Sequence, residues 1–132
     1  MDHMRLNKLE VRNSPIKGSG VFAVAPISKG EIVIVWHPLR VIAPSELVGY
    51  SIMERHFIAP TDDGSFLLMG EPERYVNHSC DPNTRVVGQT DITIRNIEPD
   101  EEITGDYAHD GTVVGFQCNC GSVKCKGWVG PK

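Results

Sequence analysis

The chain has 132 residues and a mass of 14.6 kDa, which suits one compact domain and excludes a multidomain assembly. Hydrophobic residues make up 40% and charged residues 23% of the chain, so its composition is that of a folded protein, not a disordered one. The net charge of −4 has the wrong sign for direct nucleic-acid binding through phosphates and favours a basic protein partner.

The location of the protein is predicted from the apolar runs. None reaches the roughly 20 residues needed to cross a bilayer, and the first residues lack the apolar stretch of a signal peptide. We therefore expect no membrane contact and an intracellular, cytoplasmic protein, which would be nuclear or chromatin-associated in a eukaryote or as an exported effector. Residues 1–4 are expected to be an added or disordered start.

Thirteen glycines and nine prolines divide the chain into short segments, which favours many strands over long helices. A strand is predicted at 9–12, where apolar and polar residues alternate, and two more at 21–24 and 32–36, where β-branched or aromatic runs stand between Gly and Pro. A tight turn over 26–31 joins the last two strands. A short helix is predicted over 45–54 with Ser45 as its N-cap, although Gly49 disfavours a helix interior.

Two hairpins are predicted further along the chain. Segments 56–59 and 65–69 flank residues 60–64, which end in an Asp-Gly pair, and segments 85–87 and 92–94 flank a polar turn at 88–91. No segment repeats another at a fixed period. The pattern predicts a mainly β domain.

The four cysteines need an explanation. Three lie within the last fifteen residues, in a Gly-rich tail with few large apolar side chains, and Cys80 lies far upstream. Two disulfides, ordinary buried thiols and a metal site are the alternatives; an intracellular chain keeps its thiols reduced, and clustering in a polar tail argues against core cysteines. We favour one structural zinc ion per chain, with the four thiolate ligands Cys80, Cys118, Cys120 and Cys125.

Four motifs follow one another in the chain: GSGVFA at 18–23, RYVNHSCDPN at 74–83, EEITGDY at 101–107 and the closing cysteines. In this order they resemble a SET-domain protein lysine methyltransferase with a post-SET zinc segment, over about residues 9–128. The resemblance implies a SET domain over 5–115 and a post-SET segment over 116–132. It implies a mainly β (α+β) fold of several short curved sheets, with the 77–79 and 106–107 segments threaded together as a pseudoknot.

The resemblance also implies an activity, the transfer of methyl groups from S-adenosylmethionine to a lysine amine in a basic protein or peptide. Glycines without Cβ atoms would let the loop backbone approach the cofactor, and Phe116 or Trp128 would cover its adenine. Simple turn or core roles for the glycines, Asn77 and His78 remain alternatives, as does a carboxylate partner for Arg74. The implied cofactor-binding residues are Lys17, Gly18, Ser19, Gly20, Val21, Phe22, Arg74, Asn77, His78, Phe116 and Trp128.

Tyr107 matches the catalytic tyrosine of the family, although a buried tyrosine bonded to a backbone carbonyl is an alternative. With an ordinary pKa of ~10, a tyrosine is better suited to orient the substrate amine than to act as a strong base. Gly105 stands where relatives carry Phe or Tyr, so the channel that Gly105 and Tyr107 form should be wide enough for di- or trimethyl-lysine, unless Tyr50 or Phe66 fills the gap.

The family's zinc-rich segment ahead of the SET domain is not expected here, so we expect the insertion at 44–70 to select the substrate. The acidic residues at 100–102 are predicted to form a solvated turn that helps attract a basic substrate. Two other functions are open: a catalytically weak SET-like module that binds a peptide or partner, and a small zinc-stapled interaction domain without a cofactor.

Overall fold

The computed structural model describes residues 8–131, so the start predicted at residues 1–4 lies outside them. The strands are β1 Leu9–Asn13, β2 Ser19–Ala23, β3 Ile32–Val35, β4 Arg40–Ile42, β5 Ile58–Pro60, β6 Phe66–Leu68, β7 Asn77–His78, β8 Thr84–Val87, β9 Thr90–Thr93, β10 Glu102–Gly105, β11 Phe116–Gln117 and β12 Trp128–Val129. The helical segments are the 3-10 helices η1 Pro44–Gly49 and η2 Glu73–Tyr75 and the α-helices α2 Ile52–Arg55 and α3 Tyr107–Asp110. None of these helices is long and apolar enough to cross a membrane.

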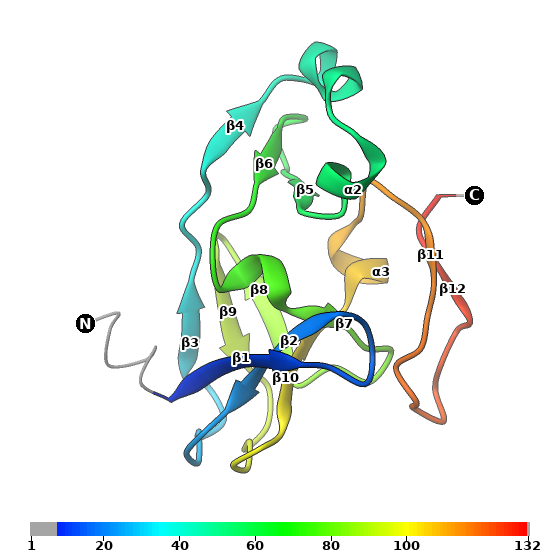
Figure 1. The fold of residues 1–132 in the computed structure, drawn as a ribbon. Coiled ribbons are helices and arrows are strands. Elements are labelled where there is room, and N and C mark those ends of the chain that lie inside the picture. The colour runs from blue at the N-terminus through cyan, green and yellow to red at the C-terminus, as the bar shows by residue number, and fades with distance from the viewer. Residues whose placement is uncertain (1–7, 132) are drawn as a thin grey trace.

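The described strands form several small sheets, as predicted for a mainly β domain. Their orders are β1-β2-β10-β7, β3-β9-β8, β4-β6-β5 and β11-β12. In Figure 1 the β4-β6-β5 sheet lies at the end of the molecule opposite the β1, β2 and β10 strands, and the β11-β12 pair runs along one side. Short strands with many turns therefore build the whole molecule.

The two predicted hairpins are present, with shorter turns than expected in one case. β5 and β6 pair across residues 61–65, close to the prediction. β8 and β9 are joined by the two residues Gly88 and Gln89, because Val87 already pairs with Thr90. Gly88 has a φ of +60°, which a two-residue hairpin turn requires and glycine adopts without strain. β9 therefore begins at Thr90, two residues before its predicted start.

The predicted helix over 45–54 is wrong in its length and in its cap. The chain forms η1 and then α2, and Ser45 lies inside η1 instead of capping a helix. The second helix is capped by Ser51, whose Oγ accepts from the Glu54 amide at 3.1 Å while Glu54 Oε1 accepts from the Ser51 amide at 2.9 Å. The break between the two helices follows Gly49, the residue least suited to a helix interior.

The hydrophobic core lies between β2, β3 and β10. Its buried members are Val21, Ala23, Ile27, Val33, Ile34, Val76, Ile97 and Ile103, with Leu9, Trp36 and Tyr75 packed at the rim. Burial of each large aliphatic side chain contributes about 1.5–3 kcal/mol. Because β2 and β10 both supply core residues, their positions and those of the neighbouring loops are fixed.

β10 and β7 run parallel, which brings together two segments far apart in sequence. Thr104 pairs with Asn77 and Gly105 pairs with His78, and the Ser79 amide donates to the Gly105 carbonyl at 2.9 Å. Asn83 is buried and binds the backbone of β10 by donating to the Glu102 carbonyl at 2.7 Å. The 77–79 segment thus lies next to the 105–107 segment, as the resemblance implied.

Candidate active site and metal centre

Two cavities meet inside the molecule. The Lys17 cavity, of about 430 Å³, lies between the 16–19 loop, α2, η2 and the start of the tail. The Asp91 cavity, of about 480 Å³, lies between the 56–62 segment, β9 and α3. Four residues line both cavities, namely His56, Phe57, Arg74 and Tyr107. A pair of cavities that share these side chains can hold two molecules with their reacting ends close together.

Most of the residues that the sequence assigned to a cofactor line the Lys17 cavity. They are Lys17, Gly18, Ser19, Arg74, Asn77, His78 and Phe116. Val21 and Phe22 are buried in β2, and Trp128 lies on β12, where its indole N–H donates to the Gly130 carbonyl at 3.1 Å. Gly20 faces Glu102, since a Cβ there would lie 2.3 Å from a carboxylate oxygen. These last four residues are not among those that line the cavity.

Asn77 fastens the loop that forms one wall of this cavity. Its Nδ2 atom donates to the Lys17 carbonyl at 3.1 Å and to the Ser19 carbonyl at 3.0 Å. The same nitrogen lies 2.9 Å from Glu102 Oε2, and Ser14 Oγ donates to the same carboxylate. The loop backbone is therefore held in place by a network that starts on β7.

Three aromatic rings form the opposite wall. The ring centroids of His78, Tyr107 and Phe116 are 5.8–6.0 Å apart, with tilted or edge-to-face contacts. Lys17 Nζ lies 5.6 Å from the Phe116 centroid. The cavity thus combines a flat aromatic surface with a polar loop, an arrangement suited to a ligand with an aromatic base and charged groups.

Tyr107 opens α3 between the two cavities. Its hydroxyl donates to the carbonyl of Val76, and Asp106 caps the helix by accepting from the amides of Ala108 and His109 at 3.0 and 3.3 Å. Burial raises the pKa of Tyr107 above its usual range, and the negative charges of Asp91 and Asp110 add to this effect. The tyrosine hydroxyl therefore stays neutral and acts as a polar, oriented group.

Arg74 contacts both cavities without a carboxylate partner among the interactions described. Its Nε and Nη2 atoms donate to the Met69 carbonyl at 3.1 and 2.9 Å, and its guanidinium lies 4.7 Å from the centroid of Phe57. The carbonyl and the ring together fix the arginine at the edge of both cavities.

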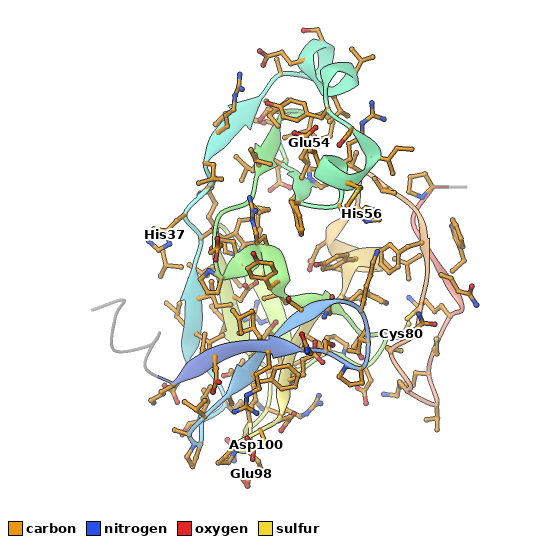
Figure 2. The ribbon with its side chains drawn as sticks, in the orientation of Figure 1. His37, Glu54, His56, Cys80, Glu98 and Asp100 are labelled. Atoms are coloured by element: carbon orange, nitrogen blue, oxygen red, sulfur yellow. The ribbon has the colours of Figure 1, made fainter. Side chains whose placement is uncertain are left out.

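The four cysteines come together beside the Lys17 cavity. Their Sγ atoms all lie within 4.8 Å of one another, and those of Cys80 and Cys118 are 3.8 Å apart. Figure 2 shows Cys80 on the side of the molecule along which the tail runs. All four are free thiols, so the disulfide alternative is not realised. Sulfur atoms bound tetrahedrally at about 2.3 Å from zinc are separated by about 3.8 Å, so the donor set fits a structural zinc ion.

The surroundings of the sulfurs support the same assignment. Burial raises the pKa of the Cys118 and Cys80 thiols, because a thiolate is poorly solvated there. The Lys126 amide donates to Cys80 Sγ at 3.3 Å. A divalent cation among the four sulfurs would compensate the negative charge of the poorly solvated thiolates.

Comparison with known proteins identifies the family. The sequence pattern of the SET domain matches residues 18–108, more than half of the chain. The chain belongs to the SET-domain family. It is 28% identical to an H3 lysine-4 specific histone-lysine N-methyltransferase of Cryptococcus neoformans var. neoformans, over 97% of this chain and 10% of that protein. It is 34% identical to histone-lysine N-methyltransferase SETD1B of Homo sapiens, over 93% of this chain and 7% of that protein.

A plant protein adds a third comparison. The chain is 38% identical to histone-lysine N-methyltransferase ASHR3 of Arabidopsis thaliana, over 54% of this chain and 16% of that protein. The chain therefore spans only a small part of the length of the curated relatives it matches. The three sequence motifs at 18–23, 74–83 and 101–107 all fall inside the SET match, whereas the cysteine tail lies beyond it.

The Asp91 cavity of this SET domain carries carboxylates that the sequence analysis missed. Asp91 is 4% exposed, and its Oδ2 atom accepts from the Trp36 indole N–H at 3.2 Å. Burial raises the pKa of Asp91 to about 7, and Asp110 and Glu73 add to the shift. Oε1 of the buried Glu73 has no hydrogen-bond partner among the described residues. The signal for Asp91 was a single acidic residue beside a β-branched segment, which was interpreted as part of a turn.

The acidic residues at 100–102 have other partners. Asp100 accepts from Arg12 at 2.9 Å, Glu101 lies 3.7 Å from Arg95, and Glu102 binds Ser14 and Asn77. None of the three is among the residues that line the two cavities. Figure 2 shows Asp100 at one end of the molecule, well away from His56. The negative charges that add to the raised pKa of Tyr107 come instead from Asp91 and Asp110.

Proposed function

We propose that this SET domain transfers methyl groups to the side-chain amine of lysine in a basic protein substrate, with S-adenosylmethionine as the methyl donor. One observation carries the proposal: two cavities of different character meet at Tyr107. Family membership and three relatives named histone-lysine N-methyltransferase support it. We assign the Lys17 cavity to the cofactor and the Asp91 cavity to the substrate.

The Lys17 cavity suits the cofactor because of its two walls. The aromatic wall of His78 and Phe116 offers a surface for a purine, and the 17–19 backbone, held by Asn77, offers polar groups for an amino-acid portion. When bound, the cofactor supplies the methyl group, whose C–S bond breaks as the lysine nitrogen forms the new C–N bond. The amine proton leaves to solvent before this step.

Tyr107 and Gly105 would form the entry to the reacting centre from the Asp91 cavity. The neutral hydroxyl of Tyr107 orients polar groups and cannot accept a proton at neutral pH, because its pKa is raised. Gly105 presents no side chain to the cavity, and neither Tyr50 nor Phe66 is among the described residues that line it. The room beside Gly105 supports di- or trimethylation as the outcome.

The carboxylates of the Asp91 cavity support a basic substrate. The negative charges of Glu73 and Asp110 are close enough to Asp91 to raise its pKa. The three carboxyl groups together attract a cation. We therefore assign the target lysine of a basic substrate to this cavity. Segment 56–62 of the predicted selectivity insertion, together with Leu67 and Met69, forms part of its wall.

Zinc binding at the four cysteines and a nuclear or chromatin-associated location are parts of the same proposal. The first rests on the sulfur geometry and the second on the histone substrates in the names of the relatives. The zinc ion has a structural role, since all four of its positions are taken by thiolates.

The test combines binding with turnover. Calorimetry with S-adenosylmethionine should show one site per chain, and incubation with labelled cofactor and a panel of basic proteins should give labelled lysine by mass spectrometry. Cofactor binding without methylation of any protein would support the weak SET-like module instead. Failure to bind the cofactor with zinc present would support the zinc-stapled interaction domain.

A further inference from the structure

A chain of hydrogen bonds connects the cysteine cluster to Tyr107 through one buried side chain. The Tyr107 backbone N–H donates to Nδ1 of His78 at 2.9 Å. On the other side of the ring, Nε2 of His78 lies 3.2 Å from Sγ of Cys80. His78 is 3% exposed, so water does not compete for either contact. The imidazole is therefore the direct link between a zinc ligand and the residue at the junction of the two cavities.

The partners of the ring fix where its proton lies. A backbone N–H can only donate, so Nδ1 of His78 must be the unprotonated nitrogen. The neutral ring then carries its proton on Nε2 and donates it to the Cys80 sulfur. Cys80 receives a second hydrogen bond from the Lys126 amide at 3.3 Å. Two N–H groups thus share the negative charge that a zinc-bound thiolate retains.

The same ring also forms part of the Lys17 cavity. It makes a tilted contact with Tyr107 and an edge contact with Phe116, and its backbone pairs with Gly105. A rotation of the imidazole would break both hydrogen bonds and displace two aromatic neighbours together. The ring has one arrangement that satisfies all of these contacts.

We infer that His78 is a positioning residue whose side chain couples the metal-bound Cys80 to the backbone of Tyr107. The metal holds Cys80 as a thiolate, the thiolate holds the Nε2–H tautomer of His78, and this tautomer accepts from Tyr107 and sets the first turn of α3. The inference rests on the proposed methyl transfer only for its activity measurements. The resemblance implied that His78 binds the cofactor; the role inferred here belongs to its side chain and connects it to a metal ligand.

The tautomer is tested in the wild-type chain loaded with cadmium-113 in place of zinc. Nitrogen-15 NMR of labelled histidine should show a neutral His78 protonated on Nε2, with scalar coupling between this proton and the cadmium through the sulfur. A proton on Nδ1, or no coupling to the metal, overturns the inference. This measurement needs no substitution and no activity.

Two variants separate the two hydrogen bonds. The amide of His78→Asn reaches the place of Nδ1 and can still accept from Tyr107, whereas that of His78→Gln reaches the place of Nε2 and can still donate to Cys80. His78→Phe keeps a ring and loses both contacts. Cobalt affinity, the sulfur-to-cobalt absorption bands, and kcat and KM for methyl transfer are measured for each, with His37→Gln, at an exposed position outside both cavities, as control.

The expected results differ between the variants. His78→Asn should lose about 10- to 100-fold in metal affinity and show shifted cobalt bands, the scale for loss of a hydrogen bond to a metal ligand. His78→Gln should keep its metal affinity within about threefold and lose at least about tenfold in kcat. Equal behaviour of the two amide variants, or a His78→Phe protein with wild-type spectrum and kcat, overturns the inference. A wild-type protein inactive on every substrate counts against the proposed function and leaves the spectroscopic tests valid.

Discussion

The hydroxyl of Tyr107 donates a hydrogen bond to the backbone carbonyl of Val76, the residue immediately before the β7 strand. The bond fixes the ring at the junction of the two cavities, so Tyr107→Phe removes the polar group and keeps the ring contacts. We expect methyl transfer to fall by about two orders of magnitude, while S-adenosylmethionine affinity stays within about threefold. Single-turnover kinetics and calorimetry measure the two effects. Tyr50→Phe, outside both cavities, is the control, and full turnover by Tyr107→Phe would remove the tyrosine from the mechanism.

Loss of the metal should weaken cofactor binding as well as stability. Phe116, Cys118 and Asn119 line the Lys17 cavity, so a tail that detaches takes part of the cavity wall with it. We expect elemental analysis to find one zinc ion per chain, and Cys80→Ser to lower both zinc and cofactor affinity by at least about tenfold. Val123→Ala, at a fully exposed position between two ligands, should change neither. A Cys80→Ser protein with undiminished zinc affinity would exclude Cys80 as a ligand.

Gly105 should set the degree of methylation. A Cβ placed there would lie 4.0 Å from Thr84 Oγ1 and Val76 Cγ1, which is ordinary contact, so a side chain can begin at this position without a clash. We expect the wild type to produce di- or trimethyl-lysine at long incubation and Gly105→Tyr to shift the product toward monomethyl-lysine, because the ring narrows the channel. Mass spectrometry of the substrate decides, with Gly105→Ala as a small-side-chain control. A wild type that stops at monomethyl-lysine would contradict the prediction.

The parts of the fold that local pattern determines could be predicted from the sequence. Alternation of apolar and polar residues predicted β1, β-branched or aromatic runs between Gly and Pro predicted β2 and β3, and the Asp-Gly pair predicted the β5–β6 hairpin. β7 is only two residues long and has no periodicity of its own, so its position beside β10 came from the family resemblance alone. The cysteine cluster was predicted from residue type and spacing, because few other arrangements of four thiols suit a short polar tail.

The Asp91 cavity could not be predicted in the same way. Asp91 lies in a four-residue strand in which every residue but Ile92 is polar, and nothing local distinguishes an inward carboxylate from one in a turn. Its burial depends on Trp36, 55 residues away, and its neighbours Glu73 and Asp110 come from two further elements. Such a cluster exists only after the sheets have packed, so composition and spacing carry no sign of it.

Asp91 should make stability fall as the pH rises. Its pKa is about 7 in the folded protein, above its ordinary value, so the folded chain holds a proton that the unfolded chain releases near pH 4. The stability that this proton provides is complete below about pH 4 and is lost by about pH 7. Asp91→Asn keeps an acceptor for Trp36 and does not ionise. We expect it to be more stable than the wild type by about 2–4 kcal/mol at pH 8 and similar at pH 4.

Urea unfolding at the two pH values measures this difference, and Glu98→Gln, at an exposed position, is the control for loss of one charge (Figure 2). Asp91→Asn should also lower the affinity for a basic peptide at pH 8, because the cavity loses a negative charge. An Asp91→Asn protein whose stability tracks that of the wild type at both pH values would contradict the assignment. The other charged groups that line the cavity are His56, Asp62, Glu73, Arg74, His109 and Asp110.

Gly70 should tolerate no side chain. It is buried, and a Cβ there would lie 2.1 Å from the His37 carbonyl oxygen and 3.2 Å from Glu73 Oε2. We expect Gly70→Ala to lower the free energy of unfolding by about 1–3 kcal/mol, the usual range for overpacking. Gly49→Ala, where the Cβ meets open space, should be neutral or slightly stabilising. Thermal and urea unfolding compare the two, and equal stability of both variants would contradict the prediction.

The position of β10 between β2 and β7 has a consequence for the order of folding. Its partner residues are Phe22 and Val21 on one side and Asn77 and His78 on the other, so none of its pairings is a local hairpin. Contacts between residues so far apart in sequence form slowly, because the loops between them must close first. Hairpins such as β8–β9 need no such closure and can form early. Gly105, Tyr107 and His78 therefore come together only when these long-range pairings have formed, so a chain that holds its hairpins alone has no assembled site.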